Sequence, residues 1–109
     1  SAMQAARFYY GVLNATIIDA KYLPDFKEIF GNPAIKHKFV KGLQGRKDIE
    51  IYRKSGTWRN YHADSAVVAR NNLVYLVVYI DNHPAAGRAA VEGIRIVDDV
   101  LVAYANQSR

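Results

Sequence analysis

A lysine, a serine and a glycine stand together in the segment Lys54–Thr57, whose sequence is Lys-Ser-Gly-Thr. We expect it near the end of a strand, where Lys54 and Gly56 would point to one side of the sheet and Ser55 to the other. Such an edge suits acyl transfer, because an ammonium and a hydroxyl can bind an anionic substrate and an edge amide can face a developing oxyanion. Glycine leaves room for a substrate to approach the backbone. The tripeptide alone is more typical of a solvated lysine in a hairpin turn, and only its sequence context favours a binding role.

Three helices are expected before this segment, because apolar residues recur there at helical spacing. Pro24 suits the first turn of the second helix, and Asn32-Pro33 is a typical opening for the third. Gly42 or Gly45 would end the third helix. The three apolar stripes are Ala5, Phe8, Tyr9, Val12 and Leu13, then Leu23, Phe26, Ile29 and Phe30, then Ile35, Phe39 and Leu43.

Three antiparallel strands are predicted from Asp48 onward, where the apolar period becomes two. In the first, Ile49, Ile51, Arg53 and Ser55 would face one way and Glu50, Tyr52 and Lys54 the other. The second covers roughly Tyr61–Arg70 and the third roughly Leu73–Ile80, with a tight turn at Asn71-Asn72. The third strand is apolar on both faces, which favours a position between two layers.

A long C-terminal helix is expected from about Ala85 to Ala105, after His83-Pro84. Its apolar face would comprise Ala90, Ile94, Val97, Leu101 and Tyr104, widened by Ile96, Val100 and Ala103. The predicted order is three helices, a three-stranded antiparallel sheet and this long helix, which is an α+β fold. We expect residues 1–109 to form a single unit.

The segment from Lys54 to Val68 resembles the Lys-(Thr/Ser)-Gly strand, short turn and Asp-x-Ala-Val strand of class A β-lactamases and related penicillin-recognising serine hydrolases. Met3–Asn14 and Tyr22–Leu43 are similar to the helices that lead to this strand in the family. A third strand ending in Tyr79-Ile80-Asp81 and a C-terminal helix follow in the same order. The resemblance covers nearly the whole chain and implies the C-terminal portion of such a hydrolase, with a partial β-lactamase-like fold.

The resemblance implies substrate-binding roles for a short set of residues: Lys54, Ser55, Gly56, Thr57 through its amide as half of an oxyanion hole, and Arg59 for a carboxylate. Asp64 matches a family position, and we expect it to be a structural hydrogen-bond partner. Trp58 would either form a wall of the substrate groove or pack against the fold.

The nucleophile of that family, a serine in a Ser-x-x-Lys motif, is absent. None of the four serines, Ser1, Ser55, Ser65 and Ser108, has a lysine three residues later, and no Ser-Asp-Asn occurs. We therefore expect no catalytic residue in this chain and no activity from it alone. The resemblance implies a parent enzyme that hydrolyses β-lactams or peptidoglycan-type peptides outside the cytoplasmic membrane, in the periplasm or after secretion.

The parent would supply further strands, so we expect the chain to self-associate or to bind the N-terminal half of that parent. No signal peptide is visible at Ser1-Ala2-Met3, since no basic segment precedes an apolar stretch. The longest apolar run, Leu73–Ile80, is too short to span a membrane.

The composition leaves open a different class of function, a small basic α+β module that binds nucleic acid or a protein partner. The formal net charge is +5, which permits an anionic partner without requiring one. The basic cluster is Lys36, His37, Lys38, Lys41, Arg46 and Lys47. We interpret it first as a solvated face, so that nucleic acid is the less favoured partner.

No cofactor or metal is expected. The chain has no cysteine, which excludes thiolate catalysis, disulfides and zinc–cysteine sites. His37, His62 and His83 share no metal-ligand spacing, so we expect them at the surface.

Overall fold

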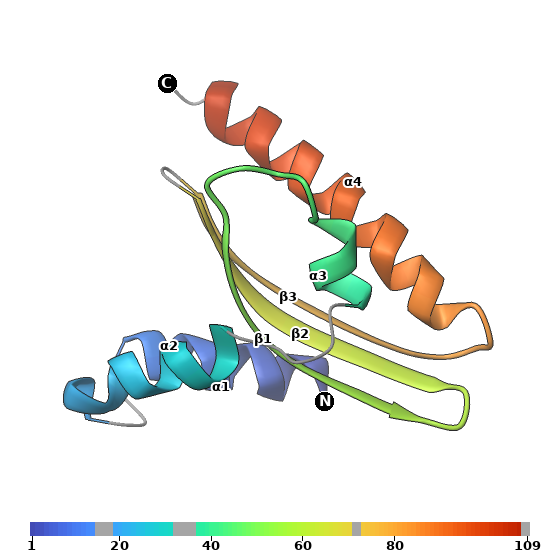
Figure 1. The fold of residues 1–109 in the computed structure, drawn as a ribbon, viewed down its shortest axis with the longest axis horizontal. Helices are drawn as coiled ribbons and strands as arrows, with labels where there is room; N and C mark the ends of the chain where they lie inside the picture. The colour runs from blue at the N-terminus through green and yellow to red at the C-terminus, as the bar shows by residue number, and fades with distance from the viewer. Residues whose placement is uncertain (15–18, 32–36, 71–72, 108–109) are drawn as a thin grey trace.

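A three-stranded antiparallel sheet with helices on both faces forms the molecule, in the computed structural model that describes residues 1–14, 19–31, 37–70 and 73–107 (Figure 1). The elements in order are α1 (Ala2–Leu13), a 3-10 turn η1 (Ala20–Tyr22), α2 (Leu23–Gly31), α3 (Lys38–Gly42), β1 (Glu50–Trp58), β2 (Tyr61–Arg70), β3 (Leu73–Asn82) and α4 (Ala86–Gln107). The predicted α+β fold, with its antiparallel sheet and long C-terminal helix, is confirmed.

The strands lie in the order β1-β2-β3, so β2 is central and β1 and β3 are edges among the described residues. Each neighbouring pair is antiparallel, with Arg53 opposite Ala66 and Val67 opposite Leu76. The expected turn at Asn71-Asn72 lies outside the described residues. The alternation predicted for β1 is confirmed, because Ile51 packs on one face of the sheet and Tyr52 on the other.

Both faces of the sheet carry a hydrophobic core, and this explains why β2 has almost no exposed side chain between its ends. Ala66, Val67 and Val68 are at most 1% exposed. One core, below α3 and α4, consists of Phe39, Leu43, Ala66, Val68, Tyr75, Ala90 and Ile94. The other, below α1 and α2, consists of Tyr9, Val12, Phe26, Tyr52 and Val67.

Helix α3 lies directly against α4 because Gly42 has no side chain. A Cβ atom at Gly42 would lie 2.3 Å from Ile94 Cγ2 and 2.6 Å from the Val91 carbonyl oxygen, which is closer than atoms can approach. Arg95 closes the contact by donating from Nε to the Gly42 carbonyl oxygen at 3.0 Å. This packing sets the position of α3 beside β1.

The third helix is shorter than predicted. It begins at Lys38, because His37 is extended, with φ −131° and ψ 180°; Asn32-Pro33 and Ile35 lie outside the described residues. The Phe39 amide donates to Asp64 Oδ2 at 3.0 Å. A carboxylate 25 residues away in β2 therefore caps the start of α3, and no local pattern encodes such a cap.

The apolar face predicted for α4 is partly wrong. Its buried row is Ala86, Ala90, Ile94 and Asp98. Ile96, Val100 and Tyr104 are 60% exposed or more. The helix contacts the sheet along one narrow row at four-residue spacing, so these three side chains lie away from it among the described residues.

Two further residues of the predicted apolar stripes are exposed. Phe8 is 42% exposed, whereas its neighbour Tyr9 is 2% exposed and packs against the sheet. Ile29 is 72% exposed and lies off the face of α2 that buries Phe26. No helix within the described residues is long and apolar enough to cross a membrane.

Candidate substrate-binding strand

The segment Lys54–Thr57 lies in the second half of the edge strand β1. Lys54 and Gly56 alternate with the same face as Tyr52, towards α1 and α2, while Ser55 and Thr57 share the face of Ile51. Ser55 is half-buried and the other three residues are exposed. Among the described residues, Lys54 donates from Nζ only to the neighbouring Ser55 carbonyl oxygen, at 3.0 Å. An edge strand presents unpaired backbone groups on one side, so this segment is open to an extended ligand.

A buried lysine in α3 holds this segment from one face of the sheet. Lys38 is 4% exposed, and its Nζ donates to the Gly56 carbonyl oxygen at 2.8 Å, to Thr57 Oγ1 at 2.8 Å and to the Ala63 carbonyl oxygen at 3.1 Å. Three acceptors match the three N–H groups of an ammonium. Burial lowers the pKa of Lys38, which the nearby Asp64 carboxylate partly opposes. The ammonium therefore joins α3, β1 and β2 at the Gly56 position.

A tyrosine in α1 holds the segment from the opposite face. Ser65 Oγ donates to the Lys54 carbonyl oxygen at 3.0 Å, and it lies 2.9 Å from the Tyr9 hydroxyl. Since the single hydroxyl hydrogen of Ser65 is used on Lys54, the Tyr9 hydroxyl is the donor towards Ser65, where Oγ and the carbonyl oxygen, at 3.2 Å, are its two acceptors. Burial raises the pKa of Tyr9, so its hydroxyl keeps this proton at neutral pH. The backbone of β1 is thus fixed at Lys54 as well as at Gly56.

A buried ion pair joins β1 to β2 next to this segment. Arg53 donates from Nε and Nη2 to the two carboxylate oxygens of Asp64, at 3.1 Å and 3.0 Å. Asp64, 1% exposed, also accepts from the amides of Phe39 and Ser65. Its predicted structural role is therefore confirmed. Arg53 Nη2 further donates to His37 Nδ1 at 3.1 Å.

Arg59, predicted to bind a carboxylate, lies in the turn between β1 and β2, beyond the Lys54–Thr57 segment. It has a positive φ of 53°, and its guanidinium stacks on the Trp58 ring at 4.4 Å from the ring centre. Trp58 is 61% exposed and its ring centre lies 6.2 Å from that of Tyr61. An exposed aromatic tip therefore continues the strand, and Trp58 packs there rather than in the core.

The prediction that the histidines lie at the surface is wrong for two of the three. His83 is exposed, but His37 and His62 are half-buried. Burial and the neighbouring Arg53 and Lys38 lower the pKa of His37, and the contact from Arg53 requires an unprotonated Nδ1. Among the described residues, no group of three or more His, Cys, Asp or Glu side chains could hold a metal ion.

The basic cluster is not one solvated face. Lys38 is buried, His37 contacts Arg53, and Arg46 lies 2.6 Å from both Asp98 and Asp99. Lys41 and Lys47 are exposed, and Lys36 lies outside the described residues. Much of the positive charge counted in the sequence therefore serves internal contacts, which weakens the case for a nucleic-acid surface here.

No described serine has the neighbours of an activated nucleophile. Ser1 caps α1 by accepting from the Gln4 amide, and Ser65 binds Tyr9 and the Lys54 carbonyl. No hydrogen bond joins Ser55 Oγ to a lysine or a histidine among the described residues. The described part of the chain therefore contains no activated serine.

Comparisons with solved structures identify the arrangement of helices and sheet. The structure of PBP-A matches over 88% of this chain with a TM-score of 0.74 and 17% identity. A β-lactamase from Sphaerobacter thermophilus matches over 86% with a TM-score of 0.72 and 13% identity. The chain has a partial β-lactamase-like fold. It spans 37% of the length of each of these two structures. Comparison with sequence models of families and with curated proteins gave no match.

The contacts that support the Lys54–Thr57 segment were not predicted from sequence. Lys38, Tyr9 and Ser65 position the strand, although none of them belongs to a recognisable motif. Lys38 was counted with a charge run and Tyr9 with an apolar stripe. Each description omits the polar atom that reaches the sheet: Lys38 Nζ, which donates to β1, and the Tyr9 hydroxyl, which contacts Ser65 in β2. Only the antiparallel register, which places Ser65 opposite Lys54, brings these atoms together.

Proposed function

We propose that this chain forms the substrate-binding part of a serine hydrolase of the β-lactamase type, and that it is inactive alone. In this proposal, the parent enzyme acts on β-lactams or on peptidoglycan-type peptides. Lys54, Ser55 and Gly56 bind the substrate, the Thr57 amide contributes half of an oxyanion hole, and Arg59 assists a carboxylate. The nucleophilic serine comes from residues beyond this chain, and the parent works in the periplasm or outside the cell.

One observation carries the proposal: the Lys-Ser-Gly-Thr segment occupies the open edge of a sheet in a partial β-lactamase-like fold. Its backbone is fixed from both faces, at the Lys54 and Gly56 carbonyls. Such preorganisation favours binding, because little ordering remains to be done when the substrate arrives. The positive charge of Lys54 lies beside this edge without an acidic partner among the described residues.

We infer that the rest of the parent covers two surfaces that the described residues leave open. One is the unpaired edge of β3, and the other is the apolar side of α4 formed by Ile96, Val100 and Tyr104. Without that cover, the isolated chain should dimerise to hide them. Light scattering at several concentrations measures this: the average mass should rise with concentration, and a constant monomer mass would contradict the inference.

Labelling with a fluorescent penicillin tests the proposed activity. The isolated chain should remain unlabelled, whereas the full product of its gene should form a covalent adduct visible on a denaturing gel. In that full product, Lys54→Ala should slow labelling by about 10- to 100-fold, the value of a charge-assisted hydrogen bond.

Lys47→Ala is the matched control, because it removes the same charge from an exposed residue before β1. It should leave labelling unchanged. Labelling of the isolated chain would contradict its proposed inactivity. A gene product that never reacts, or equal slowing by both substitutions, would contradict the proposed substrate-binding role.

A further inference from the structure

His37 connects the buried Arg53–Asp64 ion pair to the start of α3. Its Nδ1 accepts from Arg53 Nη2 at 3.1 Å, and Arg53 also donates to both carboxylate oxygens of Asp64. Since a guanidinium can only donate, the contact with His37 exists only while Nδ1 carries no proton. Protonation of His37 therefore removes a contact between α3 and β1.

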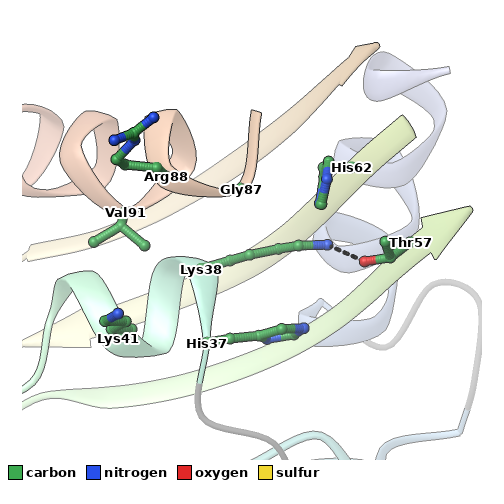
Figure 2. A pocket seen from close by; sticks show the side chains of 8 residues that line it. All are labelled: His37, Lys38, Lys41, Thr57, His62, Gly87, Arg88 and Val91. Atoms are coloured by element: carbon green, nitrogen blue, oxygen red, sulfur yellow. Dashed lines mark hydrogen bonds between the residues drawn. The ribbon is translucent and has the colours of Figure 1, made fainter. Parts of the chain in front are cut away.

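The next residue, Lys38, holds the Lys54–Thr57 segment from an unfavourable backbone conformation. Its Nζ donates to the Gly56 carbonyl oxygen and to Thr57 Oγ1, and Figure 2 shows the side chain extending to Thr57 between His37 and His62 (Figure 2). The φ of Lys38 is 50°, in the left-handed region that a lysine seldom adopts. Helix α3 has only five residues, and His37 caps it without a side-chain hydrogen bond. Contacts with the sheet therefore keep this helix start in place.

A protonated His37 would add positive charge to surroundings that are already cationic. Burial and the charges of Arg53 and Lys38 lower the pKa of His37, and the Asp64 carboxylate opposes only part of this effect. That carboxylate is already paired with Arg53. The charged and titratable groups around His37, in contact with it or across the cavity that it lines, are Lys38 and Lys41 of α3, Arg53 of β1, Asp64 and His62 of β2, and Arg88 of α4.

We propose that protonation of His37 releases the start of α3, so that Lys38 withdraws from Gly56 and Thr57 and the Lys54–Thr57 segment loses its support from this face. As a control of activity, this acid-sensitive release rests on the proposed function of the segment. The release itself is a property of the chain and needs no substrate.

Protonation of His37 and the hold of Lys38 on β1 oppose each other reciprocally. The held arrangement, in which Lys38 contacts Gly56 and Thr57, requires a neutral His37 ring. For each unit by which this arrangement lowers the pKa of His37, protonation shifts the equilibrium about tenfold towards release. The hold is complete above the ordinary pKa of histidine, about 6.5, and weakens as the pH falls through the lowered pKa of His37.

Nuclear magnetic resonance of the whole chain between about pH 7.5 and about pH 4.5 tests the release, because most carboxyls stay ionised in this range. The Thr57 side chain, fixed by Lys38 in one rotamer, should change to averaged three-bond couplings with the same midpoint as the His37 ring signals. His37→Gln keeps an acceptor for Arg53 that does not titrate, so Thr57 should stay fixed throughout. The controls His83→Gln, at an exposed histidine, and His62→Gln, beside Lys38, should behave like the wild type.

A Thr57 rotamer that stays fixed while His37 titrates, a His37 ring that stays neutral throughout the range, or the same averaging in His37→Gln would each overturn the proposal. Labelling of the full gene product with fluorescent penicillin tests the consequence for activity. Between neutral and acidic pH, the labelling rate should fall up to about tenfold further in the wild type than in His37→Gln, and equal profiles would overturn the regulation. A gene product that never reacts would contradict the proposed function, whereas the Thr57 couplings would still decide whether the release occurs.

Discussion

Replacing Asp64 with alanine should destabilise the chain by about 3–5 kcal/mol, the cost of removing one partner from a buried ion pair. The side chain of Arg53 is only 3% exposed, so water cannot replace the lost carboxylate. The amides of Phe39 and Ser65 would lose their acceptor at the same time. A domain of this size has about 5–15 kcal/mol of stability. Urea unfolding followed by circular dichroism at fixed protein concentration measures the loss.

Two comparison variants test whether the buried Arg53–Asp64 ion pair is the source of this stability loss. Asp81→Ala removes an exposed carboxylate that accepts from the Tyr79 hydroxyl at 3.2 Å and from the neighbouring Asn82 amide at 2.8 Å, and it should cost less than about 1 kcal/mol. The double variant Arg53→Met with Asp64→Leu removes both charges and should recover part of the stability lost in Asp64→Ala. It should not recover all of it, since the two amides stay unpaired. Equal losses for Asp64→Ala and Asp81→Ala would contradict the role of the pair.

Replacing Asp98 with alanine should cost about 2–3 kcal/mol, less than at Asp64 although Asp98 is 0% exposed. Asp98 accepts from Arg46, Arg70 and the Tyr75 hydroxyl at 2.6–3.2 Å. Arg46 and Arg70 have side chains 25% and 23% exposed, so water can solvate them after the substitution. The same urea titration measures this loss.

The contribution of Asp98 should also depend on pH. Burial alone would raise the pKa of Asp98, but hydrogen bonds from Arg70, Tyr75 and Arg46 outweigh it and hold the pKa below its ordinary value of 3.8. A carboxyl with a lowered folded-state pKa stabilises fully above its unfolded-state pKa, and this contribution is lost as pH falls through the folded-state pKa. The wild-type chain should therefore lose more stability than Asp98→Ala on acidification below about pH 4.

Asp99 is the matched control for Asp98, because its carboxylate also lies 2.6 Å from Arg46 but its side chain is 69% exposed. Asp99→Ala should cost less than about 1 kcal/mol and leave the acid limb of the stability profile unchanged. If Asp99→Ala and Asp98→Ala had the same profile, burial at position 98 would not be the source of the effect.

The strands could be predicted well from sequence because their signal is local. Period-two alternation placed Ile51 and Tyr52 on opposite faces, and the limits of β2 match the prediction. The start of α3 could not be predicted in this way, since the acceptor for the Phe39 amide is Asp64, a residue of another element. Local spacing also hid the burial of Asp98, which depends on arginines from two other segments.

The position of the candidate residues on a strand could be predicted from sequence, but the contacts that hold that strand in place could not. Lys54, Ser55 and Gly56 were identified from a short motif and its context, and the structure places them on an edge strand. The contacts from Lys38 and Tyr9 depend on side chains that reach across 18 and 56 positions of sequence. Nothing in the type or spacing of those two residues distinguishes them from a surface lysine and a core tyrosine.

The attachment of β1 on both faces has a consequence for how an active enzyme could be assembled from two polypeptides. Tyr9 and Lys38, which support the strand, belong to this same chain, so the Lys54–Thr57 segment is ordered without a contact from a second polypeptide. Joining the pieces would then be a docking step between largely folded bodies, without the entropy cost of folding on binding.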